Sequence, residues 1–300
     1  MPWPAVLPSP FPADHPPARV DGDALRISFV GHATFLIQAG GLNILTDPVW
    51  SERASPLSFL GPRRRNQPGI SFDTLPRVDA VLLSHCHYDH MDLVTLRRLW
   101  DRDRPRIITP LGNDAVIHAR HPGIEVLAAD WGDTVPLGQT GATTLVPAHH
   151  WSARGLRDRN HALWAGFLIE SLGRRIYFAG DTGFHQGNPF RHVVERHGAP
   201  DLALLPIGAY EPRWFMAPQH MNPEDAVMAF ELLGTRQALG YHWGTFRLTD
   251  EGAEQPRDEL GAALARRGIA ADRFLPMHPG QTWGDQAHTD ERRRPAASSE

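Results

Sequence analysis

The sequence contains a single cysteine, Cys86, among its 300 residues. One thiol can form neither a disulfide framework nor a cysteine-based zinc site, and a lone thiol is compatible with a reducing, cytoplasmic location. The 17 histidines contrast with that one cysteine. A metal site in this chain must therefore use imidazole and carboxylate ligands, which suit zinc, manganese or iron.

Several other features are absent, and each absence excludes a class of protein. Lys and Arg number 30 against 34 Asp and Glu, a net charge of −4, so the chain lacks the basic field that nucleic-acid binding requires. No apolar run approaches the roughly 18 residues of a membrane-spanning helix. Neither a Gly-x-Ser-x-Gly elbow nor a Walker phosphate loop occurs, which argues against a serine hydrolase or a P-loop protein.

Length and composition predict one large domain. Hydrophobic residues make up 41% of the chain and charged residues 21%, as in ordinary globular proteins. We expect a single domain over 23–284, preceded by a proline-rich coil over 1–22. The polar residues 285–300 have nothing to bury, and we predict a disordered tail there.

Strand-like runs fall into two blocks, and several of them end in a histidine or an aspartate. The first block reads as an antiparallel meander followed by a continuous apolar run, which is typical of a strand buried on both faces. The predicted strands are 25–30, 34–38, 42–46, 79–84, 143–148, 163–170, 175–179, 201–207 and 237–242.

Helix signals follow each block. Asp92 is a predicted N-cap, and Asn222, Pro223 and Asp225 form a second N-terminal signature. A last helix is predicted over 255–268. Strands and helices thus alternate in two similar halves, which predicts a layered α/β sandwich.

Directly after the strand at 79–84 comes the segment His85-Cys86-His87-Tyr88-Asp89-His90, which holds four candidate metal ligands. Alternation along an extended segment points His85 and His87 the same way and Cys86 the other way, toward packing. Asp89 and His90 fall at the turn into the helix. Such groups are rarely buried without a partner, so the spacing indicates two neighbouring metals rather than a solvated loop.

Further candidates each follow a predicted strand: the pair His149-His150, then Asp181, then His242. Alternation lets only one of the two adjacent histidines face the site. Asp181 follows Gly180, which allows the sharp turn that would present a carboxylate. Singly, each candidate has a structural interpretation, as a helix cap or a packing residue. Together they indicate a metal centre.

The HCHYDH motif, with a later His, Asp and His after strands, resembles the metallo-β-lactamase superfamily of binuclear metallohydrolases. From Phe29 to Phe246 the chain more closely resembles the N-acyl-phosphatidylethanolamine-hydrolysing phospholipase D family. This resemblance implies a four-layer αββα sandwich with a binuclear metal site at the strand ends. The segments that carry it are GHATFLIQ, ILTDPVWSERASP, GPRRR, LLSHCHYDHMD, PAHHW, FAGDTGF, PIGAYEPRWFM, QHMNPEDAV and HWGTF.

The resemblance also implies roles for individual residues. Asp47 would orient ligand imidazoles, and His220 would lie on the substrate side, with a helix cap or packing as its alternative role. His149 would be a neighbour of the site. Catalytic roles would fall to Asp181, Asp89 and His220. The implied metal ligands are His85, His87 and His150 for one ion, Asp89, His90 and His242 for the second, and Asp181 for both.

Two divalent ions, Zn²⁺ or else Mn²⁺ or Fe²⁺, would convert a bridging water to hydroxide that attacks phosphorus or a carbonyl carbon. The resemblance favours a phosphodiesterase that splits N-acyl-phosphatidylethanolamine-like phospholipids into an N-acylethanolamine and phosphatidic acid. A lactonase or ester hydrolase of the same fold, acting on sugar-phosphate lactones, is the alternative. A metal-binding protein without turnover is a third hypothesis. The expected partner is thus a small molecule or a phospholipid, and the sequence does not determine the oligomeric state.

The GAYEPRWFM segment supplies candidate substrate contacts in Tyr210, Arg213 and Trp214. An arginine run could also neutralise a phosphate, although such a run is usually a solvated face, and its role stays open. A group of four large apolar side chains would either line the substrate pocket or make peripheral contact with a bilayer. The arginine run is Arg63, Arg64 and Arg65, and the apolar group is Trp50, Phe59, Trp214 and Phe215.

Overall fold

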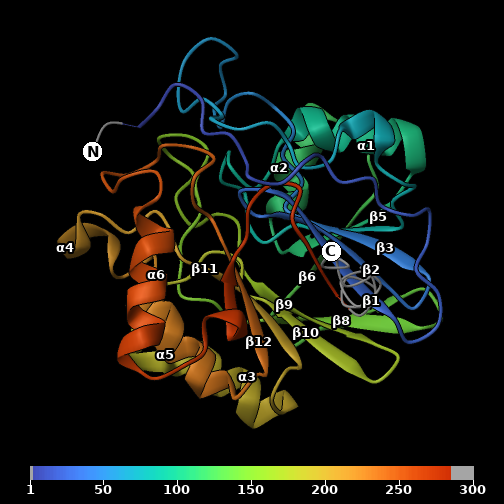
Figure 1. Ribbon diagram of the computed structural model, residues 1–300. Coiled ribbons are helices and arrows are strands. Elements are labelled where there is room, and N and C mark those ends of the chain that lie inside the picture. The colour runs from blue at the N-terminus through green and yellow to red at the C-terminus, as the bar shows by residue number, and fades with distance from the viewer. Residues whose placement is uncertain (1–2, 285–300) are drawn as a thin grey trace, which may run out of the picture.

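Two mixed sheets of seven strands each lie at the centre of the protein (Figure 1). The computed structural model describes residues 3–284, so the tail predicted over 285–300 lies outside the described residues. The first sheet, in the order β14-β1-β2-β3-β4-β5-β6, contains β1 (Leu25–Gly31), β2 (Thr34–Ala39), β3 (Leu42–Thr46), β4 (Ala80–Leu82), β5 (Arg106–Pro110), β6 (Val126–Ala129) and β14 (Thr282–Gly284). The second sheet, in the order β13-β12-β11-β10-β9-β8-β7, contains β7 (Thr134–Leu137), β8 (Gly141–Val146), β9 (Gly166–Ser171), β10 (Arg174–Phe178), β11 (Leu202–Pro206), β12 (Gln237–Tyr241) and β13 (Phe274–Pro276).

Helices cover the outer face of each sheet. In the part of the chain that is described, none of them combines the length and the apolar character needed to cross a bilayer. The α-helices are α1 (Leu93–Asp103), α2 (Asn113–Arg120), α3 (Asn188–His197), α4 (Arg213–Met216), α5 (Pro223–Leu233) and α6 (Gln255–Arg266), and the 3₁₀ helices are η1 (Phe72–Thr74), η2 (His185–Gly187) and η3 (Ala271–Arg273).

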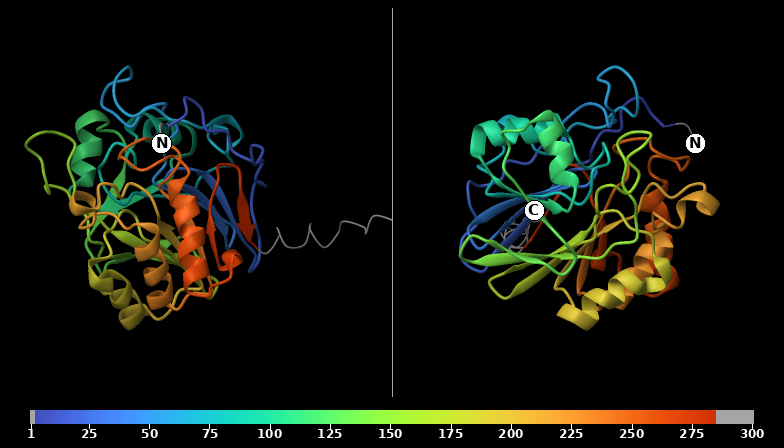
Figure 2. Two further views of the ribbon diagram at one scale, coloured as in Figure 1. Left: turned by 60° about the vertical axis from the view of Figure 1, so that its left-hand side comes forward. Right: turned by 180° about the vertical axis from the view of Figure 1, so that it is seen from behind.

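The four layers are held by three apolar clusters. One lies between the sheets and joins side chains such as Phe35 and Phe167. A second packs α1 and α2 on the first sheet, and a third packs α3, α5 and α6 on the second sheet. The two helical layers therefore lie on opposite outer sides of the sheets (Figures 1 and 2). This arrangement confirms the predicted αββα sandwich.

The predicted helix starts are confirmed by their cap contacts. The Asp92 carboxylate accepts hydrogen bonds from the first-turn backbone N–H groups of α1. Asn222 and Asp225 form a reciprocal capping box at the start of α5, with Pro223 in its first turn. Residues 3–22 form no helix or strand, and backbone hydrogen bonds from Leu7 to Arg65 and from Asp14 to Gly69 hold them against the domain.

The predicted meander is confirmed, because β1, β2 and β3 pair antiparallel in sequence order. β4 pairs parallel to β3 over only three residues. The observed strand is therefore shorter than the strand predicted over 79–84. The chain leaves the sheet at Leu83, and the residues beyond it are free to turn toward the second sheet.

Strand direction decides where the polar side chains meet. β1, β3 and β4 run in one direction in the first sheet, and β8, β10 and β12 run in one direction in the second. The segments after their carboxyl ends carry His32, Asp47, His85–His90, His150, Asp181 and His242. Side chains far apart in the sequence therefore gather at one end of the sandwich.

Candidate metal centre

The first cluster consists of His85, His87 and His150, whose ring nitrogens converge. The Nε2 of His85 lies 2.8 Å from the Nδ1 of His87, and the Nε2 of His150 lies 3.2 Å from the same Nδ1. His85 and His87 follow β4, whereas His150 follows β8, so this cluster joins the two sheets. His150 is oriented by its Nδ1, which donates to the backbone carbonyl of Gln219 at 3.0 Å.

The neighbouring His149 turns away from this cluster. Its Nδ1 lies 2.6 Å from the carbonyl oxygen of Pro218, and its ring stacks on His185 at a centroid distance of 3.8 Å. Cys86 also points away, and its side chain is buried in the cluster beneath α1 and α2. Alternation along an extended chain accounts for both orientations.

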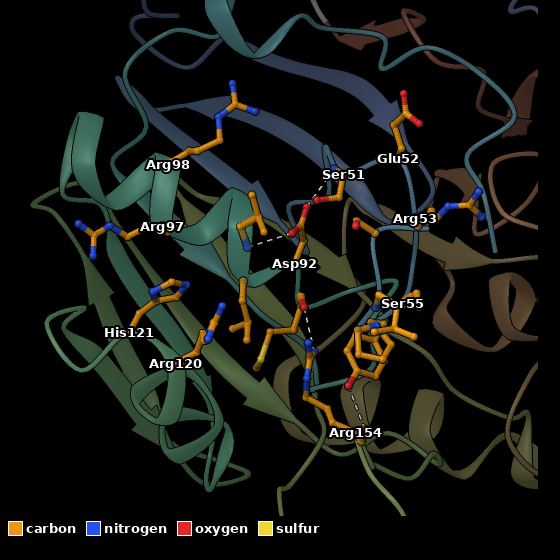
Figure 3. A pocket seen from close by; sticks show the side chains of 17 residues that line it. Ser51, Glu52, Arg53, Ser55, Asp92, Arg97, Arg98, Arg120, His121 and Arg154 are labelled. Atoms are coloured by element: carbon orange, nitrogen blue, oxygen red, sulfur yellow. Dashed lines mark hydrogen bonds between the residues drawn. The ribbon is translucent and has the colours of Figure 1, made fainter. Parts of the chain in front are cut away.

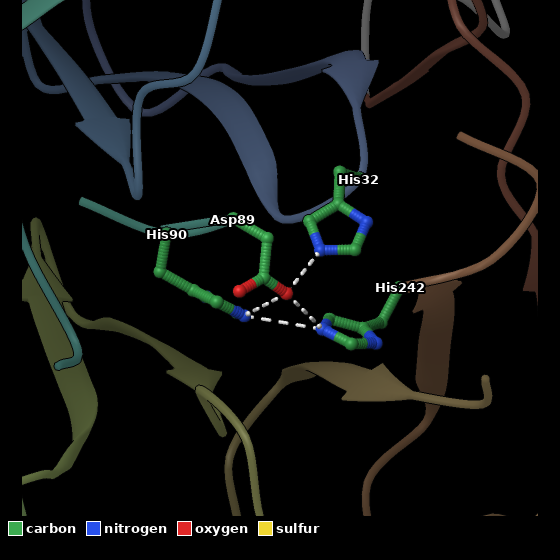
Figure 4. Close-up of side chains that lie close together, drawn as sticks. All are labelled: His32, Asp89, His90 and His242. Atoms are coloured by element: carbon green, nitrogen blue, oxygen red, sulfur yellow. Dashed lines mark hydrogen bonds and ion pairs between the residues drawn. The ribbon is translucent and has the colours of Figure 1, made fainter. Parts of the chain in front are cut away.

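The second cluster consists of His32, Asp89, His90 and His242 (Figure 4). The Nε2 atoms of His90 and His242 lie 3.1 Å apart, and each is within 3.4 Å of the Oδ2 of Asp89. His32 was not among the predicted site residues. Its Nε2 lies 2.9 Å from the same Oδ2.

Asp181 lies between the two clusters. Its Oδ2 is 3.2 Å from the Nε2 of His90, 3.1 Å from that of His242 and 3.9 Å from that of His150. Gly180 provides the turn before it with a φ of 62°, and a Cβ at Gly180 would lie 2.9 Å from a carbonyl oxygen. The structure thus places this carboxylate within reach of both groups of imidazoles.

Asp47 and Ser84 form a buried network behind the clusters. Asp47 Oδ2 lies 2.7 Å from the Nδ1 of His90 and accepts the Ser84 hydroxyl at 2.6 Å. The Ser84 oxygen lies 2.8 Å from the Nδ1 of His85. Because that hydroxyl donates its hydrogen to Asp47, it accepts from His85. One carboxylate therefore orients an imidazole in each cluster, and in the first cluster it acts through Ser84.

The electrostatics of the two clusters differ. Burial lowers the pKa of His85 and His150 well below the usual range, and nearby imidazoles lower that of His85 further. Burial also opposes the charge on His90 and His242, but Asp181 and Asp89 outweigh it, and the pKa of His242 rises to about 9. The pKa of Asp181 is held well below its usual range by His242 and His90, against the effect of burial.

The chemistry of these side chains fits a bound cation. Imidazole nitrogens point at one another at hydrogen-bond distance, although a neutral imidazole has only one N–H to share. Several buried polar atoms of these side chains have no hydrogen-bond partner; they include Nε2 of His87, Oδ1 of Asp181 and Nδ1 of His242. Convergent lone pairs, carboxylates and imidazoles oriented from behind are what a divalent transition metal requires. The His/Asp clusters are thus able to bind metal.

A cavity of about 360 Å³ opens onto the clusters, with His87, Asp89 and Asp181 in its wall. His220 also lines it, and its Nδ1 lies 3.8 Å from the Oδ2 of Asp181. Burial lowers the pKa of His220 to about 4. The other lining side chains are mostly apolar and include Trp151, Phe215, Met216 and Leu248.

Of the predicted substrate contacts, none lines this cavity. Tyr210 is buried, and its hydroxyl donates to Glu259 at 2.7 Å. Arg213 donates to the His220 carbonyl and to Asp225, so it joins α4 to the start of α5. Trp214 is 84% exposed beside the cavity residue Phe215.

The predicted arginine run also lies away from this cavity. Arg64 is half-buried, donates to the carbonyls of Val49 and Ser51, and lies over the ring of Phe246. Arg63 is exposed, 3.5 Å from Glu52, and Arg65 contacts the carbonyl of Ala5.

A second cavity, of about 710 Å³, shares Tyr88 with the first and is lined by several arginines (Figure 3). Arg154 connects the segments that form the wall shared by the two cavities. Its guanidinium donates to the carbonyls of Cys86 and Met91 and lies over the Tyr88 ring, whose hydroxyl donates back to the Arg154 carbonyl. Arg154 therefore ties the segment that carries His150 to the segment that carries His85 and His87.

Three contributors to the site were not predicted: His32, Ser84 and Arg154. The only signal for His32 was its place in the GHATFLIQ segment at the end of a strand, and Ser84 was assigned to the strand itself. Arg154 lies in an irregular loop with no motif. Their partners are distant in the sequence, so spacing alone could not identify them.

The chain is similar to known proteins over most of its length. The family described as "Beta-lactamase superfamily domain" matches residues 42–243. N-acyl-phosphatidylethanolamine-hydrolyzing phospholipase D 1 of Caenorhabditis elegans is 39% identical over 270 residues, which cover 86% of this chain and 75% of that protein. The mitochondrial N-acyl-phosphatidylethanolamine-hydrolyzing phospholipase D of Saccharomyces cerevisiae is 37% identical over 248 residues, covering 81% of this chain and 52% of the yeast protein.

Among solved structures, Igni18, a metallo hydrolase from Ignicoccus hospitalis, has the same fold. It superposes with a TM-score of 0.63 at 22% identity, covering 87% of this chain and 98% of the Igni18 chain.

Proposed function

Because this chain belongs to the metallo-β-lactamase superfamily, we propose that it is a zinc-dependent phosphodiesterase that hydrolyses phospholipids of the N-acyl-phosphatidylethanolamine type. Family and fold assign it to the metallo-hydrolases. Zinc, a count of two ions and phosphodiester specificity are parts of the proposal. The observation that carries it is the convergence of the two clusters on Asp181 in the wall of a cavity.

The first cluster would hold one ion and Asp89, His90 and His242 the other, with Asp181 contacting both. When bound, two such ions would supply an activated water and positive charge at the reacting phosphate. The protein's own part is to hold the imidazoles in place through Ser84, Asp47 and the Gln219 carbonyl. These contacts orient the ligands before the substrate arrives, so no reorganisation is needed during the reaction.

His220 faces the cavity from the substrate side. With a pKa of about 4 it is neutral near pH 7, so its imidazole would act as a hydrogen-bond donor to the phosphate or leaving oxygen rather than as a charged acid. Arg213 would position it, because the guanidinium holds the His220 carbonyl at 3.0 Å.

The surroundings of the cavity support a lipid substrate. Apolar side chains dominate its wall. Trp214 (84% exposed) precedes Phe215, which lines this cavity, and Phe59 (75% exposed) follows Ser58, which lines the second, arginine-lined cavity. Exposed apolar groups of this size are typical of contact surfaces for membranes or proteins. We infer that the substrate enters from a lipid surface, with the protein bound at the membrane periphery on the cytoplasmic side.

The test combines zinc analysis with three substrates: bis-p-nitrophenyl phosphate, a lactone, and N-acyl-phosphatidylethanolamine in mixed micelles. We expect about two Zn²⁺ per chain and release of N-acylethanolamine and phosphatidic acid. His150→Ala should lose the ion of the first cluster and, with it, the activity. The matched control His149→Ala should keep both, because His149 faces Pro218 and His185.

Turnover of the lactone alone would contradict the phosphodiesterase assignment and favour a lactonase. Two bound ions without turnover of any substrate would favour a metal-binding protein that is not an enzyme.

A further inference from the structure

His32 lies in the second cluster without any role assigned by the proposed chemistry. It follows β1, in the first sheet, yet its ring lies 4.1 Å from the ring of His242, which follows β12 in the second sheet. The side chain is 1% exposed. A buried histidine at this position needs a physical reason, because packing alone would be served by an apolar residue.

The backbone of His32 is held in an unfavourable conformation. Its φ of 57° is left-handed, which is uncommon for a residue with a Cβ. Two long-range hydrogen bonds fix it: the His242 N–H donates to the His32 carbonyl at 2.8 Å, and the His32 N–H donates to the Thr245 hydroxyl at 3.1 Å. The fold therefore accepts local strain to keep this imidazole beside His242.

The imidazole has one partner of its own, Asp89. Its Nε2 lies 2.9 Å from the Oδ2 of Asp89, and a carboxylate only accepts hydrogen bonds, so Nε2 is assigned as the protonated nitrogen. Its Nδ1 is buried and has no hydrogen-bond partner within residues 3–284. The protonated nitrogen that faces the cluster donates to Asp89, so it does not offer a lone pair to a cation.

We propose that His32 is a positioning residue that acts on a metal through Asp89. Its N–H holds one carboxylate oxygen in place beside the Nε2 atoms of His90 and His242, which lie 3.4 and 3.3 Å from that oxygen. The carboxylate is thereby fixed before a cation arrives. This inference rests on the proposed binding of metal at the second cluster and adds a residue outside the predicted ligand set.

The experiment titrates metal-free wild type, His32→Ala and His32→Gln with Zn²⁺ and Co²⁺, and records affinity, stoichiometry and the Co²⁺ electronic spectrum. Residues that orient metal ligands typically contribute about 10–100-fold in affinity. We expect His32→Ala to weaken binding of one of two ions by that factor. His32→Gln, whose amide N–H can reach the same oxygen, should recover most of the loss.

A matched control is His118→Ala, which removes a histidine hydrogen bond from α2 to the carbonyl of Ile124. It should leave both metal affinities unchanged. Thermal unfolding of the metal-free proteins separates loss of folding from loss of metal, and His32→Gln keeps the test decisive if the alanine variant does not fold.

Two results would overturn the proposal. Equal affinity for both ions in His32→Ala and wild type would make His32 a packing residue. A complete loss that glutamine does not restore, with a Co²⁺ spectrum changed in His32→Gln as well, would make His32 a ligand. Failure of the proposed function would be seen in a different measurement, the substrate assay: the wild type would bind metal but hydrolyse none of the phosphodiesters.

Discussion

The two clusters hold comparable numbers of ligands but differ in charge. The first cluster consists only of imidazoles, which burial keeps neutral. The second contains the Asp89 carboxylate, and with Asp181 it raises the pKa of His90 and His242 so that protons balance the charge in the absence of metal. The second cluster must therefore release protons when it binds a cation, whereas the imidazoles of the first cluster are already neutral and can bind one without releasing protons.

The largest effect is expected at the residue that both clusters share. Asp181→Asn keeps the shape of the side chain and removes its charge, so both ions should bind more weakly and turnover should fall by roughly 10³-fold, about 4 kcal/mol in the barrier. Zinc stoichiometry and kcat would be measured together. Full activity in this variant would contradict a role for Asp181 in either cluster.

A pH titration tests the charge difference directly. Below a pKa the ligand holds a proton that the metal must displace, so Zn²⁺ affinity at the second cluster should rise by about tenfold per pH unit for each displaced proton until about pH 9. Affinity at the first cluster should be nearly constant above pH 7. His150→Ala isolates the second cluster, and calorimetry in two buffers counts the protons released. Equal slopes for the two clusters would contradict the comparison.

A smaller effect is expected from Ser84→Ala, which removes the link between Asp47 and His85 and leaves the contact of Asp47 with His90 intact. Metal affinity of the first cluster should fall by about tenfold, while that of the second cluster stays unchanged. Ser84→Thr retains the hydroxyl and is the control. An equal loss at both clusters would mean that the network acts as one unit.

The smallest effect is expected from Arg154→Lys, because an ammonium group cannot replace the planar guanidinium that lies over the Tyr88 ring while one of its nitrogens donates to two carbonyls. We expect a several-fold loss of Zn²⁺ affinity at the first cluster, since this arginine joins its two segments. Arg102→Lys is the matched control, since Arg102 also donates to two backbone carbonyls, those of Phe72 and Leu75, far from the metal ligands. A similar loss of Zn²⁺ affinity in both variants would mean that Arg154 contributes only to the general stability of the fold.

Much of the fold could be predicted from the sequence, because its signals are local. Periodicity located the meander and the central strands, and caps located α1 and α5. The elements β5, α2, β6 and β7 between 106 and 137 were not predicted. β6 and β7 are each only four residues long, which is too short for an apolar pattern to stand out. α2 is also short, and no side chain caps its start.

For the site, too, local features could be predicted from the sequence and long-range contacts could not. The sequence by itself determined that imidazole and carboxylate, rather than thiolate, would form any metal site, and the run from His85 to His90 identified it, because these ligands are neighbours along the chain. Only the tertiary structure decided that His150 faces the cluster and His149 does not, that Asp181 reaches both clusters, and that His32 holds Asp89. These relations join the ends of strands from two sheets, and such long-range contacts are set by sheet order and strand direction, which no local pattern encodes.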